Sequence, residues 1–127
     1  MYVLQGMYFW AFNNVDAEDI KHSLLLNKNF NKVDVVYFDK LFFGILSNID
    51  LIDKYIFFCV FKKIDTISIL ELNIIRIAVF ELIFCTFIPY KVVLSEALSL
   101  SKIFGSTFGY TFVNSILNSV ILKIKFF

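Results

Sequence analysis

The amino-acid sequence predicts an all-α protein of six to seven short helices. Apolar residues recur every three to four positions through most of the chain, which is the period of an amphipathic helix. No segment shows the alternation of apolar and polar residues that a half-buried strand needs. A mid-chain stretch is apolar on nearly every side, as in a helix that lies in a protein interior. With 127 residues, the chain is expected to form a single domain over residues 1–127.

The first two predicted helices are short and separated by a polar break. Apolar residues in the first, over residues 1–12, recur at helical spacing. Asn13 and Asn14 end this helix. Asp16 can cap the second helix, which runs to about Leu26 and has acidic residues in its first turn, where the helix dipole favours negative charge.

The third and fourth predicted helices lie on either side of residues 48–50. The third begins near Asp34, and its apolar face consists of Val35, Phe38, Phe42 and Ile45. Residues 48–50 either break or kink the helix, and the fourth then continues to about Lys62. Residues 64–67 connect it to the apolar stretch.

The fifth helix, over residues 69–86, is the centre of the predicted fold, and the other helices are expected to surround it. Ser68 and Glu71 have the spacing of a capping box, in which each side chain bonds the backbone N–H of the other residue. Arg76 and Glu81 interrupt the apolar surface, so each needs a partner in the fold or at an interface. Their separation puts them on different faces, so we interpret both as structural residues that do not pair with each other.

The last two helices are marked by their ends. Pro89 suits the first turn of the sixth helix, where its missing N–H costs nothing. Gly105 follows where a left-handed C-cap is expected. Ser106 or Thr107 can cap the seventh helix, which runs to about Lys125. The predicted buried positions are Val93, Ala97, Leu100 and Phe104 in the sixth helix and Val113, Ile116, Leu117, Val120, Ile121 and Ile124 in the seventh; Ser95, Glu96, Ser99 and Lys102 are expected outside.

The composition is strongly apolar, with 59% hydrophobic residues and 17 Phe. A membrane-spanning helix needs about 20 consecutive apolar residues. The apolar runs at residues 55–61 and 82–90 are far shorter, so we expect no membrane partner. Apolar side chains left on the surface favour self-association, and a homodimer is therefore among the expected assemblies.

The sequence contains no constellation typical of catalysis, and we expect no enzyme, no metal and no cofactor. His22 is the single histidine, and we interpret it as a solvated side chain. Cys59 and Cys85 lack CxxC spacing and are expected to be buried free thiols in a reducing cytoplasm. No glycine-rich phosphate loop and no ExxH pair is present.

Several short motifs in one order resemble the NusB family of bacterial transcription antitermination factors. The likeness covers nearly the whole chain and consists of QGMYFW at 5–10, VDVVYFDKLFFG at 33–44, the helix at 70–82, IPYKV at 88–92, SEAL at 95–98, KIFG at 102–105 and FVNSIL at 112–117. The resemblance implies an all-α fold of two small packed helical bundles. It also implies a non-enzymatic cytoplasmic factor that binds boxA-type leader RNA with the NusE ribosomal protein in an RNA polymerase antitermination complex. The alternative is a degenerate helical interaction scaffold that has lost independent RNA binding.

The family's arginine-rich stretch before the QALYSW motif has no counterpart in this sequence, so RNA binding is expected to be weakened. By resemblance, the RNA-binding residues would be Tyr8, Lys102, Phe104, Tyr110, Phe112 and Asn114. Tyr8 either stacks on a base or is a half-buried helix aromatic. Phe112 is favoured as a core residue, and Asn114 as one that bonds neighbouring backbone.

The resemblance places the NusE-facing surface near the start of the fifth helix. Asp65 and Glu71 match acidic positions there and are the predicted partner-binding residues. For Glu71 this interpretation competes with the capping box, and both stay open. Ser68, Arg76, Glu81 and Pro89 are assigned structural roles.

Overall fold

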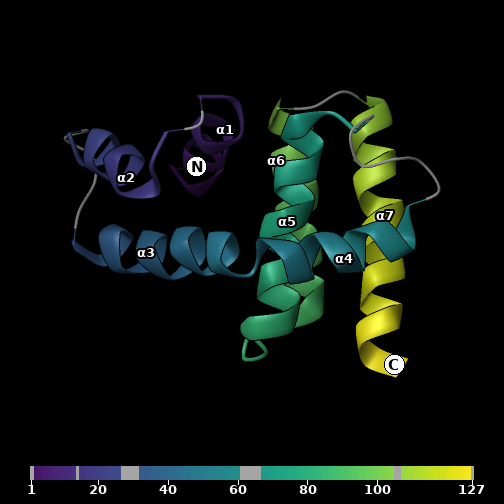
Figure 1. The fold of residues 1–127 in the computed structure, drawn as a ribbon. Helices are drawn as coiled ribbons and strands as arrows, with labels where there is room; N and C mark the ends of the chain where they lie inside the picture. Colours follow the sequence, from purple (N-terminus) through teal and green to yellow (C-terminus); the bar gives the residue numbers. More distant parts are fainter. Residues whose placement is uncertain (1, 14, 27–31, 61–66, 105–106, 127) are drawn as a thin grey trace. The chain divides into compact units, whose positions relative to one another are not determined.

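The computed structural model describes residues 2–13, 15–26, 32–60, 67–104 and 107–126. Across these residues the chain forms seven α-helices and no β-strand, which confirms the all-α prediction (Figure 1). The chain divides into two compact units, Met1–Ser47 and Asn48–Phe127. The helices expected from the sequence are all present, with ends that differ by a few residues.

The first unit consists of α1 (Tyr2–Asn13), α2 (Ala17–Leu25) and α3 (Lys32–Ser47), and α1 packs against both other helices. Its buried apolar side chains are Val3, Leu4, Met7, Ile20, Phe38, Leu41, Phe42 and Ile45, which include three of the four residues predicted for the α3 face. The fourth, Val35, is half-buried.

Contacts between named side chains join the helices of the first unit. A methyl group added at Gly6 would lie 3.1 Å from Cε1 of Phe42, a tight contact, so the close approach of α1 to α3 favours a glycine there. Lys21 Nζ of α2 lies 2.9 Å and 3.0 Å from the two carboxylate oxygens of Asp39 in α3. Asp16 occupies the predicted N-cap position of α2, but its side chain makes no capping hydrogen bond.

The second unit consists of α4 (Ile49–Cys59), α5 (Ile69–Phe84), α6 (Tyr90–Phe104) and α7 (Thr107–Phe126). In Figure 1, α5, α6 and α7 run alongside one another, and α4 lies across α5 and α7. Helix α5 contacts the other three helices, and every residue from Leu72 to Phe80 is buried. The prediction of a buried, apolar central helix is therefore confirmed for its neighbours α4, α6 and α7, whereas α1, α2 and α3 form a compact unit of their own. No helix within the described ranges is both long and apolar enough to cross a membrane.

The charge of Arg76 in the middle of α5 is balanced by a carboxylate of α4. Arg76 is 8% exposed. Its Nε and Nη2 donate to Asp53 Oδ1 and Oδ2, each at 2.9 Å, and its Nη1 donates to Asn73 Oδ1 at 3.1 Å. The partner required for this buried cation is thus Asp53, a residue that the sequence analysis did not single out.

Two predictions about the ends of α5 are wrong. Ser68 is the N-cap residue, but its side chain makes no capping hydrogen bond, so the capping box with Glu71 is not formed. The carboxylate of Glu71 lies instead beside Gly109 of α7. The helix ends at Phe84 rather than at residue 86. Cys85 is its C-cap, with a non-helical backbone (φ −116°, ψ 56°), and the N–H of Ile88 donates to the Cys85 carbonyl at 2.9 Å.

The ends of the remaining helices differ slightly from expectation. Helix α4 ends at Cys59, where Val60 is extended, and Lys62 lies outside the described residues. Pro89 directly precedes α6, and its carbonyl accepts the N–H groups of Val92 and Val93, so it caps the helix rather than occupying its first turn. The expected C-cap at Gly105 and the Ser106 cap also lie outside the described residues.

Helices α6 and α7 bury most of their predicted positions. Val93 and Ala97 in α6 and Val113, Ile116, Leu117 and Val120 in α7 are buried, whereas Leu100, Ile121 and Ile124 are half-buried. Ser101 of α6, which was not predicted to be a buried residue, is also fully buried. Ser95, Glu96, Ser99 and Lys102 are exposed, as predicted.

Candidate nucleic-acid interface

One face of α6 forms a basic groove with the start of α7. The groove has a volume of about 290 Å³, and it is lined by Lys91, Leu94, Ser95, Leu98, Ser99, Lys102 and Tyr110. We call this set the α6–α7 groove. It brings together two of the predicted RNA-binding residues, Lys102 and Tyr110.

Helical periodicity explains why these side chains share a surface. Lys91, Ser95, Leu98 and Lys102 follow one another at intervals of four, three and four residues, which places them along one stripe of a helix. The opposite stripe of α6 contains Val93 and Ala97, which are buried. Because the apolar stripe faces the core, the stripe with the lysines and serines faces outward.

Lys102 and Tyr110 are in direct contact across the groove. Lys102 Nζ lies 5.2 Å from the centre of the Tyr110 ring, within the range of a cation–π interaction. This contact joins the end of α6 to the first turns of α7. It leaves an ammonium group and an aromatic ring beside each other at one end of the groove.

The charge and polarity of the α6–α7 groove suit an RNA strand. The described residues that line it include two lysines and two serines, and none of them has a carboxylate. Lys91 and Lys102 are separated by about 16 Å along the axis of α6, at 1.5 Å per residue. Ammonium and hydroxyl groups spaced in this way can contact successive phosphates, while an aromatic ring can stack on a base.

The other residues of the predicted RNA surface lie outside this groove. Tyr8 belongs to α1 in the first unit, is 47% exposed and has its ring 6.4 Å from that of Phe9 in an edge-to-face arrangement. It therefore presents an aromatic side chain to solvent. Phe104 is the last residue of α6, and its side chain lies outside what the structure describes.

Phe112 and Asn114 are in α7, and neither lines the groove. Phe112 is half-buried. Asn118 Nδ2 donates to the backbone carbonyl of Asn114 at 2.8 Å and to Asn114 Oδ1 at 3.1 Å. The Asn114 side chain is thus engaged within α7, with a neighbouring side chain rather than with the backbone.

The predicted partner surface is described only at Glu71. This residue is half-buried in the first turn of α5, with its carboxylate against Gly109 of α7. Asp65 lies outside the described residues. The assignment of both residues to a protein partner stays a prediction.

Sequence reasoning missed three residues of the α6–α7 groove that carry polar groups. Lys91, Ser95 and Ser99 line it together with Lys102. Ser95 and Ser99 were placed outside the core but given no function, and Lys91 was read only as part of the IPYKV motif. The periodic spacing of 91, 95, 98 and 102 was the signal that could have identified this surface.

The single histidine and the two cysteines of the chain differ in how far they are buried. The described residues contain no group of three or more His, Cys, Asp or Glu side chains that could hold an ion. His22 is exposed, as predicted. Cys85 is a buried free thiol, but Cys59 is only half-buried, which corrects the prediction for that residue. Burial raises the pKa of the Cys59 thiol, and the charge of Lys123 partly offsets this effect.

Comparison with known proteins shows one consistent likeness. The sequence model of the NusB family matches residues 1–122. The transcription antitermination protein NusB of Legionella pneumophila (strain Corby) is 35% identical over 105 residues, which cover 83% of this chain and 71% of that protein. The structure of T. maritima NusB superimposes with a TM-score of 0.87 and 27% identity, covering 96% of this chain and 87% of the other. A structure of the antitermination factors NusB and NusE in complex with dsRNA contains a chain with a TM-score of 0.88 and 24% identity, covering 96% and 92%.

Proposed function

The chain belongs to the NusB family, and on this premise we propose that it is a transcription antitermination factor that binds boxA-type RNA together with a NusE-type ribosomal protein. In this role it is an adaptor without catalytic activity in a cytoplasmic RNA polymerase complex. The whole chain would act as one domain.

The observation that carries the RNA-binding part of the proposal is the α6–α7 groove. Two lysines, two serines and a tyrosine line it, and no carboxylate is found among the lining residues that the structure describes. Contacts to phosphate supply most of the affinity of a protein for a nucleic acid, and aromatic rings add stacking on bases. A helical scaffold without RNA binding is not favoured, because it leaves the two lysines and the tyrosine of the groove without a role.

The proposed mechanism is joint presentation of the RNA by two weak binders. A groove with two lysines supports only modest affinity at physiological salt. When a second RNA-binding protein docks on the same chain, the RNA that it holds is presented to the groove at high effective concentration. The predicted docking residue in the described part of the chain is Glu71.

A titration with and without the NusE-type protein tests this function. We expect labelled boxA-type RNA to bind the chain alone weakly and to bind the mixture at least tenfold more tightly, with the gain arising from effective concentration. An RNA of the same length and scrambled sequence is the control. Equal affinities with and without the ribosomal protein would contradict joint presentation.

A further inference from the structure

A second basic and aromatic pocket lies in the same unit, between α4 and α7. Its volume is about 250 Å³, and it is lined by Leu51, Lys54, Tyr55, Phe58 and Lys123. We call this set the α4–α7 pocket. Sites for drug-sized ligands begin at about 300 Å³, so this pocket suits a group of the size of one nucleotide or less.

The pocket is built from one outward face of α4. Leu51, Lys54, Tyr55 and Phe58 stand at intervals of three, one and three residues, which places them on one side of the helix. Ile52 and Ile56, on the other side, are fully buried. The pocket therefore exists because α4 packs against the core through its isoleucines.

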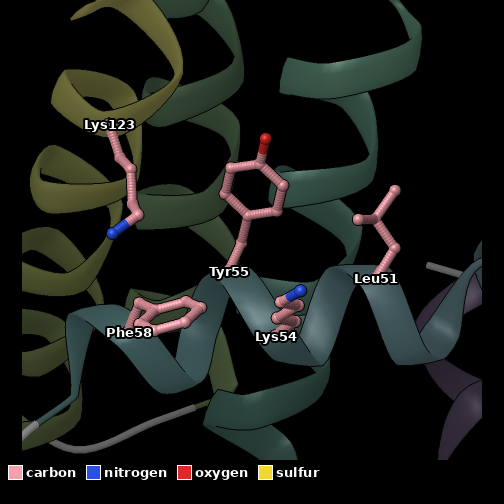
Figure 2. A pocket seen from close by; sticks show the side chains of 5 residues that line it. All are labelled: Leu51, Lys54, Tyr55, Phe58 and Lys123. Carbon is pink, nitrogen blue, oxygen red and sulfur yellow. The ribbon is translucent and has the colours of Figure 1, made fainter. Parts of the chain in front are cut away.

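Lys123 closes the pocket from α7. Its Nζ lies 4.5 Å from the centre of the Phe58 ring, and Figure 2 shows it reaching from α7 toward that ring. Lys54 and Tyr55 project from the preceding turn of α4. Phe58 nevertheless remains 59% exposed, so much of its surface is accessible to a ligand.

We propose that the α4–α7 pocket is a second RNA subsite, which takes one nucleotide of a single-stranded segment outside the boxA-type element. Lys54 and Lys123 would contact its phosphate, and the exposed surface of Phe58 would stack on its base. The inference rests on the proposed RNA-binding function and extends it to a region that the sequence analysis did not identify.

The lining favours RNA over an acidic peptide. The carboxylates of an acidic peptide would engage the two ammonium groups, but they supply no planar ring to stack on the exposed aromatic surface. A nucleotide presents both a phosphate and a π-face, and it therefore uses all the polar and aromatic features of the pocket. Among the described residues that line the pocket, none has a carboxylate that would repel a phosphate.

The pocket and the α6–α7 groove are separate sites. Tyr110 of the groove and Lys123 of the pocket lie about 20 Å apart along α7, at 1.5 Å per residue. At about 100° per residue they also point from different faces of that helix. One RNA molecule can reach both sites only when it extends beyond the element held in the groove. The subsite is therefore tested by comparing a short RNA with an extended one.

The experiment compares two RNAs on the complex of the full chain with the NusE-type protein. One is the boxA-type element alone, and the other carries an added tract of uridines. We expect Lys54→Met and Lys123→Met each to weaken binding of the extended RNA about fivefold and to reduce its salt slope by about 0.7 per lysine. Neither change should alter binding of the short RNA. Lys40→Met, an exposed lysine of α3, is the control of equal charge.

A second variant and a crosslink address the stacking. Phe58→Leu keeps an apolar side chain but removes the ring, and we expect about tenfold weaker binding of the extended RNA only. Uridines replaced by 5-iodouridine should crosslink to Tyr55 or Phe58, and thermal unfolding verifies that each variant is folded. If the short RNA fails to bind but these crosslinks form, the proposed function fails while the subsite stands.

Four outcomes would overturn the subsite. The first is that both RNAs bind the parent and both lysine variants with equal affinity, and the second is that Lys40→Met weakens binding of the extended RNA as much as the pocket variants do. The third is that uridine monophosphate binds as tightly as the extended RNA. The fourth is that a polyglutamate peptide binds at the pocket while the extended RNA does not. The last two would assign the pocket to a free nucleotide and to an acidic protein segment, respectively.

Discussion

Arg76 in the centre of α5 donates two hydrogen bonds of 2.9 Å each to the two carboxylate oxygens of Asp53 in α4. The fork geometry of the guanidinium matches the two carboxylate oxygens, which makes such a pair both strong and directional. The arginine side chain is 9% exposed and the aspartate side chain 28%. The pair therefore fixes how α4 lies on α5, and with it the position of the α4–α7 pocket.

Removal of Asp53 is expected to destabilise the protein severely. Asp53→Ala leaves the Arg76 charge buried without its carboxylate, and the loss of one partner of such a pair costs about 3 kcal/mol or more. Urea unfolding measures the change. The double variant Asp53→Ala/Arg76→Met removes both charges, and it should lose at least about 1 kcal/mol less than the sum of the single variants. Additive losses would show that the pair is not coupled.

Substitution of Ser101 is expected to stabilise the protein. Its side chain is fully buried in α6, and its Oγ makes no hydrogen bond within the described part of the chain. Ser101→Ala removes an unsatisfied hydroxyl and improves helix propensity, so we expect a gain of about 1 kcal/mol. Ser99→Ala, in the same helix but exposed, is the matched control and should change the unfolding free energy by less than half as much. A loss of stability in Ser101→Ala would contradict this account.

The contact of Gly109 with Glu71 predicts a coupled pair of substitutions. A Cβ at Gly109 would collide with the Glu71 carboxylate and lie 3.2 Å from its Cγ. Because the atom that the Cβ would meet first is the far end of a flexible side chain, Gly109→Ala should displace the Glu71 carboxylate and destabilise the protein by no more than about 1 kcal/mol, the lower end of the cost of overpacking. In the background of Glu71→Ala the same change should be neutral or stabilising, because alanine is the better helix former. Thermal unfolding of the four proteins gives the coupling, and its absence would show that Glu71 moves away freely.

The lysine at the end of the α6–α7 groove is expected to contribute to RNA binding. Lys102→Met should weaken binding of boxA-type RNA about threefold to tenfold and reduce the salt slope by about 0.7, the contribution of one phosphate contact on a single strand. Tyr110→Leu should weaken binding further without changing the salt slope, because stacking involves no counterion release. Fluorescence anisotropy at several salt concentrations separates the two effects. A salt slope unchanged by Lys102→Met would remove this residue from the interface.

Alkylation of Cys59 is expected to be slow and to depend on Lys123. The reactive form is the thiolate, and burial raises the pKa of Cys59, so less thiolate is present at any pH below that pKa. The rate should rise with pH with a midpoint above that of a small-molecule thiol. Because the Lys123 charge lowers this pKa, Lys123→Met should move the midpoint higher still. Mass spectrometry after iodoacetamide treatment distinguishes Cys59 from buried Cys85, and a midpoint unmoved by Lys123→Met would contradict the coupling.

Local signals in the sequence were sufficient to predict the helices. The central position of α5 followed from its apolar residues on all sides, and the breaks near Asn48 and Pro89 followed from residue type. The capping box failed because its spacing allows a side-chain hydrogen bond but cannot require one. Glu71 had a competing position against Gly109, and only the packing of α5 on α7 decided between them.

In the candidate sites, too, some residues were predicted from local sequence and others were revealed only by the packing of the helices. Lys102 and Tyr110 were identified from motifs, whereas Lys91, Ser95 and Ser99 were not. The α4–α7 pocket could not have been found at all, because Phe58 and Lys123 are far apart in the chain.

By itself the sequence determined the helical class, the order of the helices, the buried central helix and the family. These properties depend on residue type and on spacing within one turn or two, which a single chain segment contains. Only the tertiary structure decided that Asp53 balances Arg76, that Glu71 lies against Gly109 and that lysines and aromatic rings from different helices share pockets. Such pairings depend on how helices cross in space, and that geometry results from the packing of the whole unit rather than from any one segment.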